Sequence, residues 1–273
     1  MSSEKKEKIP MPKPNFQVPA NAESHVKKMI GVVSGKGGVG KSSVTGLCAL
    51  WALRHGYRTG IMDCDITGPS IPKMFGVTPD DVGVINLKED GSGTLLPAET
   101  ATGMKIMSMN LLMENEDQPV IWRGPVVAGV VKQFWTDVAW GDIDYLFVDM
   151  PPGTGDVPLT VFQSLPIDGI LIVTTPQDLV SMIVRKAVNM AKSMNIPILG
   201  LVENMSYARC PHCGEKIYMF GESRAQEVAA LEGTVLIESL PVDPALAVAM
   251  DNGLMEYYET EVLDGLAGVL PKV

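Results

Sequence analysis

The chain has few cysteines, a deficit of positive charge and no long apolar run, and each shortage excludes a class of protein. Four cysteines in 273 residues are too few for a disulfide scaffold. No apolar run reaches the ~18 residues of a membrane span, and the N-terminus lacks the hydrophobic stretch of a secretory signal. The formal charge of −10 disfavours sequence-independent binding to nucleic acid or anionic lipid. We therefore expect a cytoplasmic protein that has neither a nucleic acid nor a membrane as its partner.

The composition, 46% apolar and 20% charged, is that of an ordinary globular protein. Residues 1–26 contain several prolines and no sustained apolar period, which predicts a flexible N-terminal tail. Residues 27–273 are expected to form one domain, because short apolar runs alternate with helix-length patterns throughout. This alternation predicts an α/β fold with a single doubly wound, mostly parallel sheet and helices on both faces.

The expected elements follow from these patterns. Strands are predicted over Met29–Ser34, Thr59–Asp63, Lys105–Met109, Tyr145–Asp149, Gly169–Thr174, Ile198–Val202 and Val235–Ser239. Helices are predicted over Lys41–His55, Pro125–Trp140, Asp178–Asn195 and Asp243–Asn252. The stretch Thr78–Gly103 is rich in loops, and Asp90–Gly93 is expected at the tip of a hairpin.

The sharpest motif is a phosphate-binding loop between the first predicted strand and the first predicted helix. It fits G-x-x-x-x-G-K-[ST] and consists of Gly35, Lys36, Gly37, Gly38, Val39, Gly40, Lys41 and Ser42. Glycines let successive backbone N–H groups face an anion, and the following helix adds its positive N-terminal end. We expect Lys41 to reach the β- and γ-phosphates, Ser42 to ligate Mg²⁺, and Ser43 to join the nucleotide-binding residues.

Lys36 is an additional cation within this loop. Two lysines so close together repel each other unless phosphate oxygens or a carboxylate share the charge. The pattern resembles the deviant Walker A motif of the MinD, nitrogenase iron protein and ArsA group of dimeric ATPases. That resemblance implies a homodimer in which Lys36 reaches the ATP bound by the partner subunit. A solvated surface lysine is the alternative.

Acidic residues follow two of the predicted strands. Asp63 and Asp65 fall on one side of a strand if that strand extends to Asp65, at the edge where Mg²⁺ and an attacking water would lie. We expect Asp65 to orient the water and Asp63 to lie nearer the metal; capping of a turn is the alternative. Asp149 ends a buried strand in the Walker B arrangement, whose carboxylate holds Mg²⁺ directly or through water. The following Met150–Asp156, rich in Pro and Gly, is expected to be either a switch loop or a rigid turn.

Asn204 follows the strand predicted to end at Val202. Its amide has the donor and acceptor that could contact an adenine edge, although asparagine at a strand end is also a common turn former.

Cys210 and Cys213 form a CxxC pair within an insert near residues 206–219. In a reducing compartment such spacing indicates metal or redox chemistry. Two thiolates cannot complete a tetrahedral sulfur site, but two copies related by a dimer axis supply four. A bridging iron-sulfur cluster, an interfacial zinc and a redox or structural thiol pair are all open. Cys48 is expected in the core, and the charges of the flanking Asp63 and Asp65 are expected to raise the pKa of Cys64. Neither cysteine is expected to be a ligand.

Over about residues 27–265 the chain resembles the Mrp/ApbC family of P-loop ATPases, the iron-sulfur cluster carrier proteins. Beyond the phosphate loop, the resemblance rests on Asp63-Cys64-Asp65, Gly68-Pro69-Ser70, Arg123-Gly124-Pro125, Asp149–Asp156, Thr174-Thr175-Pro176-Gln177, Glu203-Asn204-Met205 and Cys210-Pro211-His212-Cys213. It implies a homodimeric ATPase that binds a labile [4Fe-4S] cluster and exchanges it with a cluster assembly scaffold and apo iron-sulfur proteins. The tail lacks the four cysteines of the eukaryotic branch, which leaves only the bridging site.

Two other functions are possible on the sequence. One is a MinD- or ParA-like ATP-dependent spatial organiser, which the acidic chain end and the lack of a basic stripe disfavour. The other is an ATP-driven electron-transfer component like the nitrogenase iron protein, whose cysteine ligands are more widely spaced in sequence.

Overall fold

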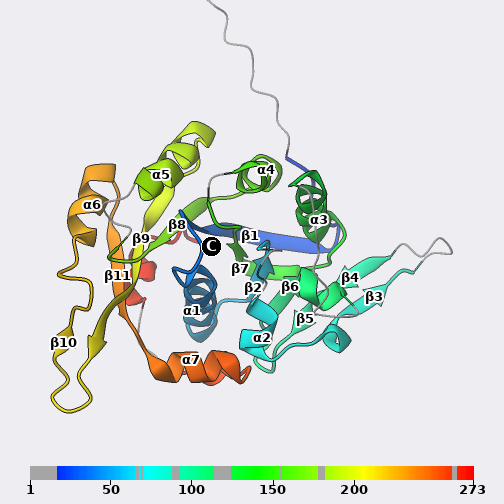
Figure 1. Cartoon of the computed structure of the whole chain (residues 1–273). Helices are drawn as coiled ribbons and strands as arrows, with labels where there is room; N and C mark the ends of the chain where they lie inside the picture. Colours follow the sequence, from blue (N-terminus) through cyan, green and yellow to red (C-terminus); the bar gives the residue numbers. More distant parts are fainter. Residues whose placement is uncertain are drawn as a thin grey trace, which may run out of the picture.

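A nine-stranded, mostly parallel sheet forms the centre of the fold, and a separate two-stranded hairpin lies beside it (Figure 1). The structure is a computed structural model that describes residues 17–65, 68, 70–87, 93–113, 124–153, 155–177, 182–259 and 263–273. Among these residues, no helix is long and apolar enough to cross a membrane.

The elements alternate along the chain as expected for a doubly wound sheet. The strands are β1 (Ser24–Ser34), β2 (Thr59–Asp63), β3 (Gly83–Ile85), β4 (Thr94–Leu96), β5 (Ala98–Glu99), β6 (Lys105–Ser108), β7 (Gly141–Asp149), β8 (Gly169–Thr174), β9 (Ile198–Arg209), β10 (Lys216–Ile217) and β11 (Leu236–Pro241). The α-helices are α1 (Lys41–Arg54), α2 (Ile71–Phe75), α3 (Gly124–Thr136), α4 (Asp156–Ser164), α5 (Met182–Met194), α6 (Ala225–Glu232) and α7 (Pro244–Asp251). Short 3₁₀ turns cover Pro79–Asp81, Met109–Leu112, Met255–Tyr257 and Asp264–Gly268.

The strand order places β1 at the middle of the sheet. From one edge the order is β5-β6-β2-β7-β1-β8-β9, and β11 pairs with β9 in parallel. Only the short strands β5 and β10 run antiparallel to their neighbours in this sheet. The strands β1, β2 and β7 therefore end at the same edge, where acidic and loop residues gather.

Helices cover both faces of the sheet, as Figure 1 shows. On one face, α3, α4, α5 and α6 bury a core that includes Phe134 and Val188. On the other face, α1 and α2 bury a second core that includes Leu50 and Phe75. Strands β2 and β8 are buried at every position, and both have the bounds predicted from the sequence; in β8 the residues between Gly169 and Thr174 form the continuous apolar run typical of a strand covered on both sides.

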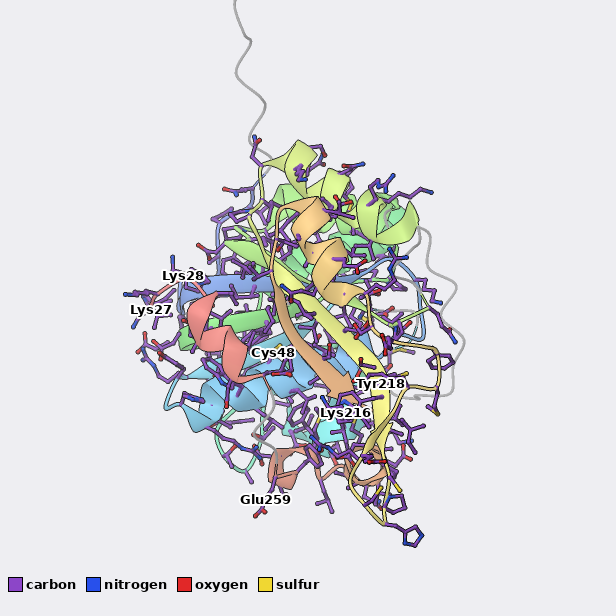
Figure 2. All side chains as sticks on the ribbon, turned by 90° about the vertical axis from the view of Figure 1, so that its left-hand side faces the viewer. Lys27, Lys28, Cys48, Lys216, Tyr218 and Glu259 are labelled. Atoms are coloured by element: carbon purple, nitrogen blue, oxygen red, sulfur yellow. The ribbon has the colours of Figure 1, made fainter. Side chains whose placement is uncertain are left out.

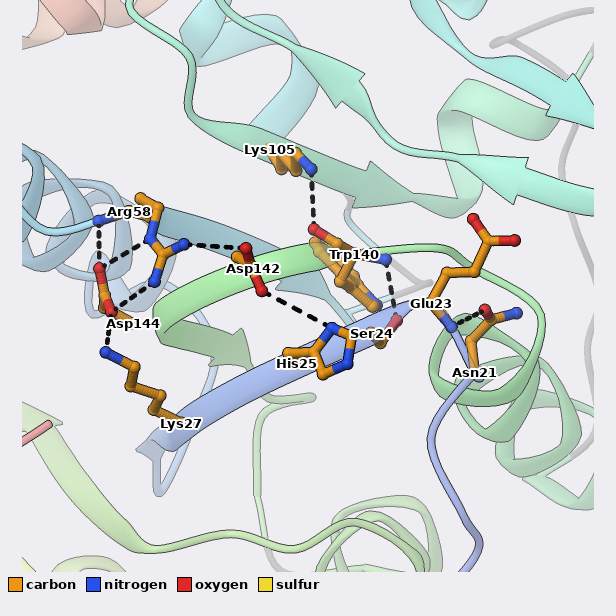
Figure 3. Close-up of polar contacts among 10 residues, drawn as sticks. All are labelled: Asn21, Glu23, Ser24, His25, Lys27, Arg58, Lys105, Trp140, Asp142 and Asp144. Atoms are coloured by element: carbon orange, nitrogen blue, oxygen red, sulfur yellow. Dashed lines mark hydrogen bonds and ion pairs between the residues drawn. The ribbon is translucent and has the colours of Figure 1, made fainter.

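Strand β1 begins at Ser24, five residues before its predicted start, and β7 begins at Gly141 rather than Tyr145. Figure 3 shows the reason, because charged side chains pair across these strand ends. Asp144 Oδ1 forms ion pairs with Lys27 Nζ at 2.8 Å and with Arg58 Nη2 at 3.1 Å. Residues 17–26, which we assigned to the tail, also contact the body, since Val18 N donates to Ser164 O at 3.0 Å.

Other boundaries differ from the expected ones. The helix predicted to reach Trp140 ends at Thr136, because Val138 forms a parallel bridge with Leu95. The strand predicted to end at Val202 continues to Arg209, and the strand predicted from Val235 spans Leu236–Pro241. Several predicted features lie outside the described residues: residues 1–16 of the tail, Asp90–Ser92, Arg123, Thr154 and the helix start at 178–181.

Candidate functional site

The phosphate loop links the end of β1 to the start of α1 at the carboxyl edge of the sheet. Gly38 and Gly40 have φ values of 80° and 77°, a conformation that glycine adopts without steric cost. The loop borders a cavity of about 320 Å³. The cavity is lined by Ser34, Lys36, Gly37, Gly38, Gly40, Lys41, Ser42, Ser43, Asp65, Gly68, Ser70, Met74 and Pro152. A loop of backbone N–H groups at a helix N-terminus is suited to binding phosphate.

Two of the predicted loop residues do not line this cavity. Gly35 begins the loop beside Ser34, and the side chain of Val39 is buried in the core below it. Lys36 is exposed at the cavity, and its backbone carbonyl accepts a hydrogen bond from Ser34 Oγ at 2.9 Å. Its exposure fits both the predicted reach toward a partner subunit and a solvated lysine.

Lys41 lies between two carboxylates. Its Nζ is 2.8 Å from Asp149 Oδ2 and 3.4 Å from Asp65 Oδ2. Burial alone would lower the pKa of Lys41, but the charges of Asp149 and Asp65 outweigh it, so that the pKa is raised. Lys41 is therefore a charged ammonium near neutral pH at the cavity, which suits a group that binds phosphate oxygens.

Asp149 is the centre of a hydrogen-bond network. Ser42 Oγ donates to Asp149 Oδ2 at 2.6 Å, and Thr45 Oγ1 donates to Asp149 Oδ1 at 2.7 Å. The structure thus brings together the predicted Mg²⁺ ligands Ser42 and Asp149. The sequence reasoning missed Thr45, although its place one helical turn after Lys41 puts both residues on the same face of α1.

Asp63 is the last residue of β2 and does not line the cavity, whereas Asp65 follows the strand and lines it. Strand β2 ends at Asp63, and Asp65 N donates to Asp63 Oδ1 at 3.1 Å. Ser108 Oγ, a second residue missed from the sequence, donates to Asp63 Oδ2 at 3.0 Å. Burial and the negative charge of Asp149 raise the pKa of Asp63 to about 8. In this arrangement Asp63 holds the end of β2, while Asp65 is the carboxylate that reaches the cavity.

Asn204 lies inside β9 and not at a strand end as predicted. Its Nδ2 donates to the carbonyl of Val39 at 2.9 Å. A Cβ on Gly40 would come closer to this amide than the 3.0 Å that real Cβ atoms keep. The amide of Asn204 therefore packs against the phosphate loop and hydrogen-bonds its backbone.

Cys210 and Cys213 lie at the turn between β9 and β10. Cys210 N donates to Glu215 O and Gly214 N donates to Cys210 O, both at 2.9 Å. Cys213 is exposed and Cys210 partly exposed. Hydrogen bonds from the backbone N–H groups of Cys213 and His212 lower the pKa of Cys210, which favours the thiolate that binds metals.

The other two cysteines are buried, as expected for Cys48. Burial raises the pKa of Cys48, and burial together with the charge of Asp63 raises the pKa of Cys64. Figure 2 labels Cys48 in the interior, and it labels Lys216 and Tyr218 on the outlying hairpin. Within the described part of the chain, no group of three or more His, Cys, Asp or Glu is arranged to hold a metal ion.

Comparison with known proteins gives a consistent result. Residues 25–266 match the family described as NUBPL iron-transfer P-loop NTPase. An iron-sulfur cluster carrier protein of Clostridium perfringens is 48% identical over 238 residues, which are 87% of this chain and 84% of that protein. An iron-sulfur cluster carrier protein of Pyrococcus horikoshii is 45% identical over 237 residues, which are 85% and 80% of the two chains.

Among solved structures, the nucleotide-binding protein of Archaeoglobus fulgidus in complex with ADP is similar. It has a TM-score of 0.76 and 41% identity, over 87% of this chain and 92% of that one.

Proposed function

Because the chain belongs to the NUBPL iron-transfer P-loop NTPase family, we propose that it is a homodimeric ATPase that carries a [4Fe-4S] cluster to apo-proteins. The cluster is the cargo, and Cys210 and Cys213 of each copy are its ligands. The single observation that carries this proposal is the CxxC turn, in which one exposed and one partly exposed thiol lie on a hydrogen-bonded hairpin and the pKa of Cys210 is lowered.

The nucleotide half of the proposal rests on the phosphate loop. Gly35–Gly40 would bind the triphosphate through backbone N–H groups, and Lys41 would contact its β- and γ-oxygens. Mg²⁺ fits the oxygen donors of Ser42 and Asp149, which lie 2.6 Å apart. When bound, the ion neutralises charge that develops on the phosphates.

The remaining site residues take supporting roles in the proposal. Asp65, at the cavity and 3.4 Å from Lys41 Nζ, would orient the attacking water. Asp63, which accepts the backbone N–H of Asp65, would lie near the metal and its bound water. Lys36, exposed at the cavity, would contact nucleotide bound by the second copy, and Asn204 would lie near the base.

The cluster half requires two copies. One chain offers two accessible thiols, of which Cys213 is exposed and Cys210 partly exposed, and a four-sulfur site needs four. A two-fold axis that brings two hairpins together supplies them. The cluster would then lie at the surface of the assembly, from which a scaffold can load it and an apo-protein can remove it. Free thiols of this kind fit the reducing cytoplasm.

Anaerobic reconstitution with iron and sulfide tests the cluster half. We expect wild type to take up about two iron atoms per chain, because one cluster of four irons is shared by two copies. Cys210→Ser and Cys213→Ser should lose the iron and sulfide. His212→Ala, which keeps both thiols and the turn, is the matched control and should bind like wild type.

The alternatives give different readouts in the same experiment. Tightly bound zinc without sulfide would replace the cluster by a zinc site. Iron and sulfide that persist in Cys210→Ser would exclude the hairpin from cluster binding. The nucleotide half is tested separately, because Lys41→Ala should abolish ATP hydrolysis without loss of the cluster.

A further inference from the structure

One strand connects the phosphate loop to the cysteine pair. Strand β9 contacts the phosphate loop through Asn204, whose Nδ2 donates to Val39 O at 2.9 Å. The same strand ends at Arg209, directly before Cys210. At about 3.3 Å per residue for an extended chain, Asn204 and Cys210 are at most about 20 Å apart. No other described strand reaches from the loop to the thiols without a break.

The strand is irregular at the point where it meets the loop. Glu203 pairs with Ser239 of β11, but the next pair is Tyr207 with Pro241. Three residues of β9 therefore lie opposite one residue of β11, which makes a bulge of residues 204–206. Within the bulge, Met205 has a φ of 54°, a left-handed conformation that is unfavourable for a residue other than glycine. Bulges near functional sites re-aim side chains, and here the re-aimed side chain is the amide of Asn204.

Glu203 lies at the start of this bulge, and its carboxylate hydrogen-bonds both the last residue of the bulge and the neighbouring strand β11. The residue is fully buried. Its Oε2 accepts Ser206 Oγ from the same strand at 2.6 Å and Ser239 Oγ from β11 at 3.1 Å. Its Oε1 is also buried and has no hydrogen-bond partner among the described residues. A buried acceptor without a donor holds free energy that a second arrangement could recover, so the bulge is suited to having two states.

Beyond the bulge, the strand is only lightly held. Tyr207 O accepts Val242 N at 2.8 Å, and β10 contributes two paired residues, Lys216 and Ile217. The side chains of residues 211–224 are exposed. Tyr207 is buried, whereas the hairpin beyond it is exposed, so a small rotation at the bulge can move the hairpin while displacing few buried side chains.

We propose that Glu203 is a positioning residue that couples the nucleotide site to the cysteine pair. Phosphates that bind at Val39 and Gly40 shift the amide of Asn204. The bulge fastened by Glu203, Ser206 and Ser239 converts this shift into a movement of the turn that carries Cys210 and Cys213. The inference deepens the proposed function, on which it rests, because it names how nucleotide controls the cluster site.

Alkylation of the hairpin thiols tests the coupling without any iron. The full-length, cluster-free, reduced protein is treated with iodoacetamide, alone and with saturating Mg-AMP-PNP, and each cysteine is followed by peptide mass spectrometry. The buried Cys48 and Cys64 are internal references that should stay unmodified. We expect nucleotide to change the rate at Cys210 or Cys213 by about fivefold or more, the lower range of coupling between protein sites.

The variants separate coupling from a purely structural role. Glu203→Gln should bind nucleotide with an affinity close to that of wild type, yet its alkylation rate should no longer respond. Ser239→Ala removes one of the two hydroxyls on Oε2, so its response should be reduced, and it keeps the test available if Glu203→Gln does not fold. Ser193→Ala removes a hydroxyl that only bonds its own helix at Met190 O, and its response should equal that of wild type.

Two results would overturn the inference. One is a wild-type alkylation rate that is the same with and without nucleotide. The other is a full nucleotide response in both Glu203→Gln and Ser239→Ala. Because iron is absent from the assay, loss of cluster binding alone would contradict the proposed function and leave the coupling intact.

Discussion

Replacement of Gly40 by alanine tests the contact between the phosphate loop and β9. The φ of Gly40 is 77°, which costs an alanine about 1–2 kcal/mol. The added Cβ would also overlap the amide of Asn204, so the amide has to leave Val39 O. A buried carbonyl without a donor costs a further ~1–3 kcal/mol. We therefore expect Gly40→Ala to lower the free energy of unfolding by about 2–5 kcal/mol.

Gly38 provides the matched control. Its φ is 80°, but a Cβ built there meets no atom within 4 Å. Gly38→Ala should therefore cost only the conformational part, about 1–2 kcal/mol. Urea unfolding at one pH, followed by circular dichroism, measures both variants on the same scale.

A double-mutant cycle isolates the overlap itself. In an Asn204→Ala background the amide is absent and Val39 O has already lost its donor. Gly40→Ala should then cost only about 1–2 kcal/mol, which leaves a coupling energy of about 1–3 kcal/mol. If Gly40→Ala costs the same in both backgrounds, the amide of Asn204 does not support the loop and the reasoning is refuted.

Two further predictions follow from buried carboxylates. Thr45→Val keeps the shape of the side chain but leaves Asp149 Oδ1 without its 2.7 Å donor. We expect a loss of stability of about 1.5–3 kcal/mol and weaker Mg²⁺-dependent nucleotide binding. Unchanged values in urea unfolding and nucleotide titration would contradict the role given to the hydrogen bonds around Asp149. Hydrogen bonds from Arg58 hold the pKa of Asp144 below its ordinary value, so the folded state gains stability above the ordinary pKa of about 4 and loses it as the pH falls below. Asp144→Asn should therefore be less stable than wild type at about pH 7, and the difference should shrink toward about pH 3; a difference that is constant over this range would argue against the ion pairs.

The parts of the structure that depend on local sequence were predictable. Strands β2 and β8 have the predicted bounds because each contains a short apolar run, Ile61-Met62 in β2 and Ile170–Val173 in β8, between polar or glycine residues. The phosphate loop was likewise visible, since its glycines and Lys41 are contiguous in the chain. The side-chain contacts that complete the nucleotide site depend on residues distant in sequence, such as Ser108 and Asp63, and the pattern could not show them.

Strand β9 illustrates what the sequence could not show. Glu203 and Asn204 are polar, and polar residues after an apolar run favour a strand end. The structure buries both, because Ser239 of β11 and Val39 of the phosphate loop supply partners. Those partners are 36 and 165 residues away, so no local pattern could reveal them. The early start of β1 has the same origin, since Lys27 is compensated by Asp144 from another strand.

The sharing of one cluster between two chains is the central claim, and native mass spectrometry of mixed dimers tests it most directly. Wild type is mixed with a tagged Cys210→Ser/Cys213→Ser variant, and the mixture is reconstituted anaerobically with iron and sulfide. We predict that only dimers of two wild-type chains carry a [4Fe-4S] cluster, while mixed dimers form with nucleotide but carry none. A cluster on a wild-type monomer, or on the mixed dimer at the wild-type level, would contradict the account.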